Sequence, residues 1–76
     1  MKISYQDYLA EIWEAQDRFQ ILRLGQICFI VLYLREPELA NEIRGTELDP
    51  FFKDDEDMDN FWYWIARKFD SPYRRG

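Results

Sequence analysis

Residues 27–34 read Ile-Cys-Phe-Ile-Val-Leu-Tyr-Leu and form the longest uninterrupted apolar run of the 76-residue chain. As an α-helix the run is apolar all round, which is typical of a central helix wrapped by others. It is also rich in β-branched and aromatic residues, so a β-strand is the alternative. Nothing else in the chain resembles a partner strand, and a lone strand leaves its backbone groups unpaired. Unless strands pair across a dimer, the sequence predicts an all-α fold: a compact bundle of about four short helices around a central apolar helix.

Capping residues and periodicity place the helices of the first half. Ser4 and Asp7 have the spacing of a capping box, so the first helix is expected over residues 5–16. The apolar phase slips near residues 17–20, and the central helix is expected over about residues 21–35. Asp17 is a candidate cap for its start. The face that the first helix should bury carries Tyr5, Tyr8, Leu9, Ile12 and Trp13.

Proline and glycine divide the second half of the chain. Pro37 suits the first turn of a third helix, and Gly45 suits its left-handed end. Residues 46–52 are expected to form a turn, because Asp49 precedes a proline and is therefore pushed out of the α conformation. A fourth helix is expected over about residues 58–69. Its buried face should carry Met58, Phe61, Trp62, Ile65 and Phe69.

Length and charge limit the class of protein. Seventy-six residues allow one domain, expected over residues 1–70 and followed by a frayed tail at 71–76. Fifteen acidic and ten basic residues give a net charge of −5, which repels nucleic-acid phosphates and anionic lipids. Cys28 is the only cysteine, and neither a signal peptide nor an apolar stretch near the ~20 residues of a membrane span is visible. We expect a cytoplasmic protein that binds neither membranes nor nucleic acid directly.

The residues that catalysis commonly uses are scarce. The chain has no histidine, so the usual proton shuttle near neutral pH and the commonest metal ligand are missing. Cys28 therefore lacks an activating partner, and three isolated glycines make no phosphate-binding loop. Carboxylates alone would need a cleft, which four short helices rarely form. We expect neither an enzyme nor a bound cofactor.

The acidic and aromatic residues 51–64 are the predicted contact surface. Consecutive residues of a helix lie about 100° apart, so the fourth helix cannot bury Trp62, Tyr63 and Trp64 together. The alternative is that the aromatic residues, Phe51 and Phe52 among them, fill the core while the carboxylates are merely solvated. The residues expected to bind a partner are Asp54, Asp55, Glu56, Asp57, Asp59, Tyr63 and Trp64.

A calcium site in the same segment is not expected. Asp55, Asp57 and Asp59 have the spacing of the first three ligands of a calcium-binding loop. The sixth position is Asn60 rather than glycine, and the twelfth is Ala66 rather than a bidentate glutamate. Only loose association with cations is expected.

Four residues near the ends of the predicted helices are interpreted as structural. Gly25 should allow another helix to approach closely, and Gln26 should be exposed beside Arg23. Arg44 should hydrogen-bond carbonyls at the end of the third helix, or pair with Asp49 or Asp54.

A set of short motifs across residues 23–65 resembles a group of small uncharacterised proteins of bacteria and their phages. The resemblance implies no activity, but it suggests that the turn after Gly45 is a shared structural feature. Glu36 stands where that group has an arginine before the proline, so no role carries over to this position. The motifs are Arg23-x-Gly25-Gln26, Pro37-Glu38-Leu39, Ile43-Arg44-Gly45-Thr46, Asp49-Pro50-Phe51, Asp54-Asp55 and Phe61-x-x-Trp64.

The leading functional hypothesis is a non-catalytic regulatory module that presents acidic and aromatic residues to a basic surface of a protein partner. In one form it is a phage-type inhibitor that mimics nucleic acid in a partner's groove. The alternative is a structural subunit or homo-oligomer that buries surplus aromatics, with Tyr33, Tyr63 and Trp64 at the interface. Calcium sensing is a third hypothesis.

Overall fold

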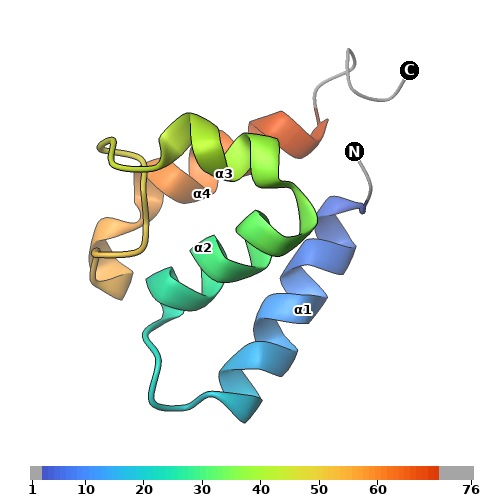
Figure 1. The fold of residues 1–76 in the computed structure, drawn as a ribbon, viewed down its shortest axis with the longest axis vertical. Coiled ribbons are helices and arrows are strands. Elements are labelled where there is room, and N and C mark those ends of the chain that lie inside the picture. Colours follow the sequence, from blue (N-terminus) through green and yellow to red (C-terminus); the bar gives the residue numbers. More distant parts are fainter. Residues whose placement is uncertain (1–2, 71–76) are drawn as a thin grey trace.

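The computed structural model describes residues 3–70 as four α-helices and one short 3-10 helix (Figure 1). The helices are α1 (Tyr5–Arg18), α2 (Leu24–Arg35), α3 (Pro37–Ile43) and α4 (Asp59–Asp70), with η1 (Asp55–Asp57) before α4. No strand occurs within residues 3–70, so the predicted all-α fold is confirmed. In Figure 1, α2 lies between α1 and α3, while α4 passes behind α3. The predicted frayed tail at 71–76 lies outside the described residues.

The core forms where α2 meets its neighbours, and Tyr8 links three of the helices. Its side chain is fully buried, and its hydroxyl donates a hydrogen bond to the carbonyl oxygen of Cys28 in α2 at 2.7 Å. Its ring stacks on Phe69 of α4, with 5.5 Å between the ring centroids. The buried apolar residues of the described chain are Tyr8, Ile12, Ile27, Cys28, Phe29, Val31, Leu32, Leu39, Ala40, Ile43, Met58, Phe61, Ile65 and Phe69.

The capping box of α1 is confirmed, but two predictions about this helix are wrong. The Ser4 hydroxyl accepts a hydrogen bond from the Asp7 N–H at 3.0 Å, and the Asp7 carboxylate accepts one from the Ser4 N–H. Asp17 lies inside α1, which runs to Arg18, and so does not cap α2. Trp13 is 70% exposed rather than buried, because a step of one residue from the buried Ile12 turns the side chain by about 100°.

The central helix begins three residues later than predicted and is less covered than predicted. Arg23 has an extended backbone at the N-cap, where its N–H donates to the Gln26 side chain at 2.8 Å. Ile30, Tyr33 and Leu34 are 37%, 45% and 71% exposed, so α2 is not wrapped all round. With α1 and α3 packed on it, α2 keeps one apolar side uncovered.

The connection from α3 to α4 is organised by Asp49, whose side chain is buried. One carboxylate oxygen accepts from the Gly45 N–H and the other from the Phe51 N–H, both at 2.9 Å. Gly45 has a φ of 75°, which confirms the predicted left-handed end of α3. Arg44 forms an ion pair with neither Asp49 nor Asp54, the two partners that were predicted as alternatives. Its guanidinium lies over the rings of Phe29 and Tyr33, at 5.7 and 5.1 Å from their centroids.

The same connection packs directly on the first turn of α2. A Cβ atom on Gly25 would lie 2.1 Å from the carbonyl oxygen of Pro50, so only glycine fits here. Two residues earlier, at the N-cap, the Arg23 guanidinium donates to the Phe51 carbonyl at 3.2 Å. Gly25 therefore allows the backbone of the α3–α4 connection to approach α2 closely. The prediction that another helix approaches at Gly25 is wrong.

Candidate functional site

The first candidate surface, named here the acidic tip, consists of Phe52, Asp54, Asp55, Glu56, Asp57 and Asp59. All six residues are exposed. The turn of η1, in which the Asp57 N–H donates to the Asp54 carbonyl at 2.9 Å, folds the segment back on itself. As a result, carboxylate oxygens of Asp54, Glu56 and Asp57 lie within 4.8 Å of one another. Three like charges at this spacing repel, which favours a positively charged partner.

The acidic tip has no cationic partner within residues 3–70. The ion pairs Arg35–Glu11 and Lys68–Glu42 lie on other parts of the molecule, and no described cation pairs with a tip carboxylate. Lys53 lies between Phe52 and Asp54 in the sequence but forms no ion pair with a tip carboxylate. The calcium-like spacing of Asp55, Asp57 and Asp59 does not produce a shared site, since the carboxylates that meet are a different set.

Tyr63 extends this surface along α4. It follows Asp59 by four residues, so the two side chains lie on the same outer face of the helix. Tyr63 is 68% exposed, which confirms that α4 leaves at least one large ring uncovered. The Arg67 guanidinium lies 5.3 Å from the centroid of its ring.

Trp64 lies on a different side of α4 and is only partly exposed. The centroid of the Trp64 ring is 6.4 Å from that of the buried Phe61 ring. The Lys68 ammonium lies 5.6 Å from the Trp64 centroid. Lys68 in turn pairs with Glu42 of α3 at 3.0 Å. The structure therefore places Trp64 partly buried against the core, apart from the acidic tip.

Phe52 is a tip residue that sequence reasoning placed only among the possible core aromatics. It is 80% exposed, so its assignment to the core is wrong. Its ring packs edge-on against Phe51 at 4.9 Å, and Phe51 packs edge-on against Phe29 of α2 at 6.0 Å. The exposed ring of Phe52 thus lies beside the carboxylates and is supported by Phe51, which packs on α2.

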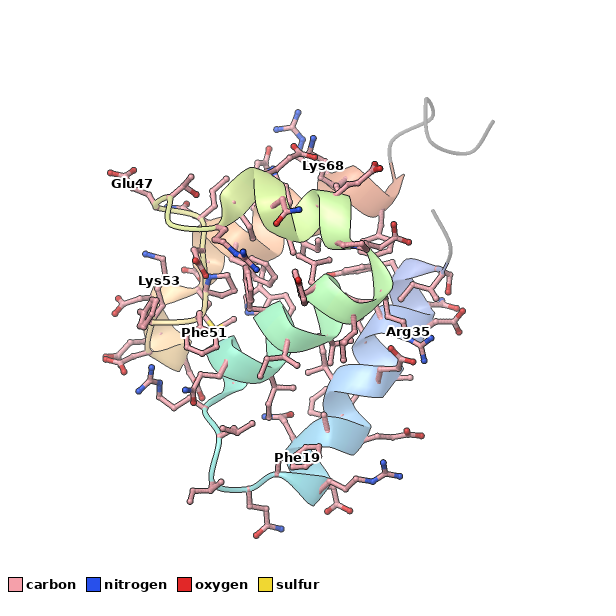
Figure 2. The ribbon with its side chains drawn as sticks, in the orientation of Figure 1. Phe19, Arg35, Glu47, Phe51, Lys53 and Lys68 are labelled. Carbon is pink, nitrogen blue, oxygen red and sulfur yellow. The ribbon has the colours of Figure 1, made fainter. Side chains whose placement is uncertain are left out.

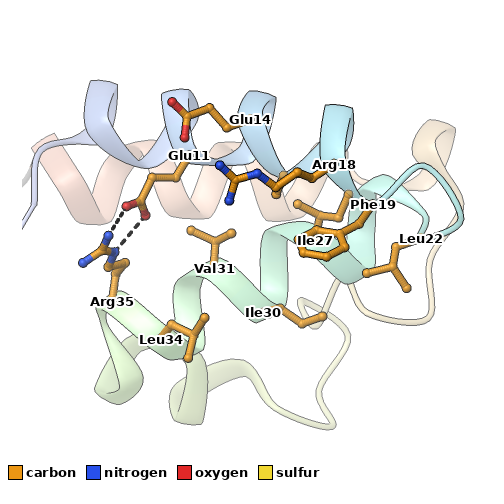
Figure 3. Close-up of a pocket in the computed structure, with 11 residues that line it drawn as sticks. Glu11, Glu14, Arg18, Phe19, Leu22, Ile27, Ile30, Val31, Leu34 and Arg35 are labelled. Atoms are coloured by element: carbon orange, nitrogen blue, oxygen red, sulfur yellow. Dashed lines mark hydrogen bonds and ion pairs between the residues drawn. The ribbon is translucent and has the colours of Figure 1, made fainter.

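The second candidate surface is an open groove between α1 and α2, which contradicts the expectation that four short helices leave no cleft (Figure 3). Its volume is about 510 Å³. The floor is apolar, and Phe19 and Leu34 stand at its two ends, 51% and 71% exposed. The lining residues are Glu11, Glu14, Ala15, Arg18, Phe19, Leu22, Ile27, Ile30, Val31, Leu34 and Arg35.

The groove lies well away from the acidic tip. Phe51 and Lys53 mark the end of the molecule formed by the α3–α4 connection, whereas Phe19 and Arg35 lie along α1 and the facing side of α2 (Figure 2). The signal in the sequence was the all-round apolar α2 in a chain too short to cover it. A second signal is the loop between α1 and α2, which contains the apolar residues Phe19, Ile21 and Leu22. In the structure, Ile21 of this loop is 93% exposed.

Cys28 packs as a small apolar side chain in the core. It has no exposed surface, and burial, with a smaller contribution from the negative charge of Asp55, raises the pKa of its thiol to about 12. A protonated thiol enclosed by the core is a poor nucleophile at neutral pH. Burial likewise raises the pKa of the Tyr8 hydroxyl well above its usual value.

The chain matches no protein-family model, no curated protein and no solved structure. The resemblance of residues 23–65 to small bacterial and phage proteins therefore stays a prediction. Within residues 3–70, every helix is too short or too polar to cross a bilayer.

Proposed function

We propose that the protein is a non-catalytic protein-binding module whose acidic tip docks on a basic surface of a protein partner. The observation that carries this proposal is the concentration of five exposed carboxylates and an exposed phenylalanine within residues 52–59, with no described cation paired to them. A nucleic-acid groove of another protein is one such basic surface, and occupying it would make the chain an inhibitor of that protein.

The composition of the tip suits this kind of contact. Carboxylates steer a basic partner towards the tip and set the orientation of docking, but exposed ion pairs add little affinity each. Aromatic side chains supply the larger share of binding energy at interfaces. Phe52 and Tyr63 are exposed on either side of the carboxylates in the sequence and provide these anchors.

We further propose that the protein acts in the cytoplasm. Its single cysteine is buried in the core and forms no disulfide there, so the fold does not depend on an oxidising compartment.

The proposal is tested by capturing partners with the tagged full chain from a cell extract, and then measuring the affinity of the purified pair by calorimetry. An Asp54→Asn/Glu56→Gln variant should bind about tenfold more weakly, since each exposed charge pair contributes up to about 1 kcal/mol. Binding should also weaken as salt rises from about 0.05 to 0.5 M.

The matched control removes two exposed carboxylates far from the tip, in Asp17→Asn/Glu38→Gln, and should bind like the unmodified chain. Affinity that is insensitive both to salt and to the tip variant would refute the proposal. An equal loss in both variants would mean that net charge alone, and not the tip, guides binding.

A further inference from the structure

We propose that the α1–α2 groove is a two-fold interface between two copies of this chain. The reason to expect an occupant is the uncovered side of α2, where Ile30 and Leu34 are exposed beside the half-exposed Phe19. A contiguous apolar surface of this kind on a small protein marks a contact site.

The rim charges favour a second copy over a basic or acidic partner. The chain carries −5, yet the groove is bordered by two acids and two bases: Glu11, Glu14, Arg18 and Arg35. This face is therefore locally neutral, so two copies can meet on it without bringing like charges together. A strongly charged partner would find no complement here.

The order of these charges along α1 makes the face self-complementary. Glu11 is already bound to Arg35, whose Nε donates to it at 2.9 Å, and this pair joins α1 to α2 at one end of the groove (Figure 3). Glu14 and Arg18 are one turn apart on the same side of α1 and form no ion pair with each other or with any described residue. In an antiparallel pairing whose two-fold axis crosses α1 at the level of Gln16, midway between Glu14 and Arg18, each Glu14 faces the Arg18 of the other copy.

The shape of the groove fits the same symmetry. A two-fold axis across its middle exchanges the two ends, so Leu34 of one copy meets Phe19 and Leu22 of the other (Figure 3). Ala15, a small side chain next to the axis, lets the two α1 helices approach closely. The smallest specific interfaces bury about 600 Å² per partner, which is near one ninth of the 5438 Å² of accessible surface of this chain. A dimer of this size is expected to dissociate in the micromolar range.

The first test compares two exposed apolar residues on opposite sides of the molecule. Leu34 and Trp13 are 71% and 70% exposed, and Trp13 lies two residues from both Glu11 and Ala15, hence on the far side of α1 from the groove. Leu34→Glu and Trp13→Glu each add one negative charge without touching the core. Sedimentation equilibrium of the full chain from about 1 to 500 μM should show a dimer that Leu34→Glu weakens about a hundredfold, because the change occurs twice, and that Trp13→Glu leaves intact.

The second test reverses the rim charges. Glu14→Arg should weaken the dimer although it lowers the net negative charge, because each new arginine faces Arg18 of the other copy. Glu14→Arg/Arg18→Glu should restore it. A chain that stays monomeric at 500 μM, or a dimer that survives Leu34→Glu, overturns the proposal. So does a dimer that Glu14→Arg tightens.

The outcome is separable from that of the proposed function. The tip variant Asp54→Asn/Glu56→Gln should remain dimeric while losing its partner, and Leu34→Glu should become monomeric while its tip stays intact. Circular dichroism of each variant establishes that the helices are retained.

Discussion

The close contact between Gly25 and the α3–α4 connection predicts an unusual result for a common substitution. Alanine is normally favoured over glycine inside a helix by about 1 kcal/mol. In Gly25→Ala, however, the added Cβ would lie 2.1 Å from the Pro50 carbonyl oxygen and 3.2 Å from that of Lys53. Both neighbours are backbone atoms, so they cannot turn aside as a flexible side chain would.

The expected size of the effect follows from these opposing contributions. Carbon and oxygen atoms in contact lie roughly 3.5 Å apart, so the connection must move away from α2 by more than 1 Å. Overpacking of this kind costs about 1–3 kcal/mol, and losing the hydrogen bond from Arg23 to Phe51 costs about 1 kcal/mol more. After subtracting the gain in helix propensity, we expect a net loss of about 2 kcal/mol. A domain of this size has only ~3–5 kcal/mol of stability.

Urea unfolding and thermal melting followed by circular dichroism measure this loss. A change of about 2 kcal/mol should lower the Tm by roughly 10 °C in a domain of this length. Gly45→Ala is the control, because a Cβ there meets no atom within 4 Å and only the left-handed φ of 75° disfavours alanine, by about 1 kcal/mol. If Gly25→Ala stabilises the protein, or destabilises it less than Gly45→Ala, the α3–α4 connection does not pack against Gly25 as closely as the structure shows.

Three further predictions concern two buried polar groups, Asp49 and Cys28. Asp49→Ala should destabilise the protein by about 2 kcal/mol in urea unfolding, since the N–H groups of Gly45 and Phe51 both lose a charged acceptor; a loss equal to that of an exposed acid changed to alanine would contradict the role given to Asp49. Cys28 should react with a disulfide reagent at pH 8 about a hundredfold or more slowly than in the urea-unfolded chain, and fast labelling of the folded protein would contradict its burial. Because the pKa of the Cys28 thiol is raised from 9.0 to about 12, its contribution to stability is complete below pH 9 and falls by about 1.4 kcal/mol per pH unit from there to about pH 12. Urea unfolding at a series of pH values should show this decline, and Cys28→Ala should show less of it, although the raised pKa of Tyr8 adds a similar decline above pH 10.

Local signals in the sequence predicted the ends of the helices where side chains cap them. Ser4 with Asp7 located the start of α1, and Gly45 located the end of α3, because the chemistry of each cap acts within four residues. The start of α2 was misplaced by three residues. Its cap is the Gln26 side chain bound back to the Arg23 N–H, and no serine, threonine, aspartate or asparagine marks the position.

Tertiary contacts decided the features that sequence reasoning missed. Arg44 has acidic residues nearby in sequence, yet it lies over Phe29 and Tyr33, which the fold of α3 back along α2 brings beneath it. Trp64 is held by packing against Phe61 and by Lys68, whereas Phe52 is left exposed. For Arg44 the deciding neighbours come from another helix, α2, whereas for Trp64 they lie within α4 itself.

The uncovered side of α2 follows from a shortage of helices rather than from its own sequence. Residues 27–34 are apolar in every direction, and α1 and α3 between them cover only part of the circumference. The same pattern that predicted a central helix therefore also implies a further contact, since Ile30 and Leu34 remain exposed. Sequence periodicity cannot distinguish a helix covered within its own chain from one covered by a second copy.

The separation of the two surfaces makes their salt dependences opposite, which gives a way to tell them apart in one preparation. Two copies carry −10 together, so salt screens their repulsion and should leave the apolar, locally neutral groove contact unchanged or tighter. The acidic tip, by contrast, depends on attraction to a basic partner, which salt weakens. A partner that dissociates in high salt while the chain remains dimeric would place partner binding on the tip and self-association on the groove. If both contacts weakened together, the Glu14–Arg18 ion pairs, and not the apolar floor of the groove, would provide most of the stability of the dimer.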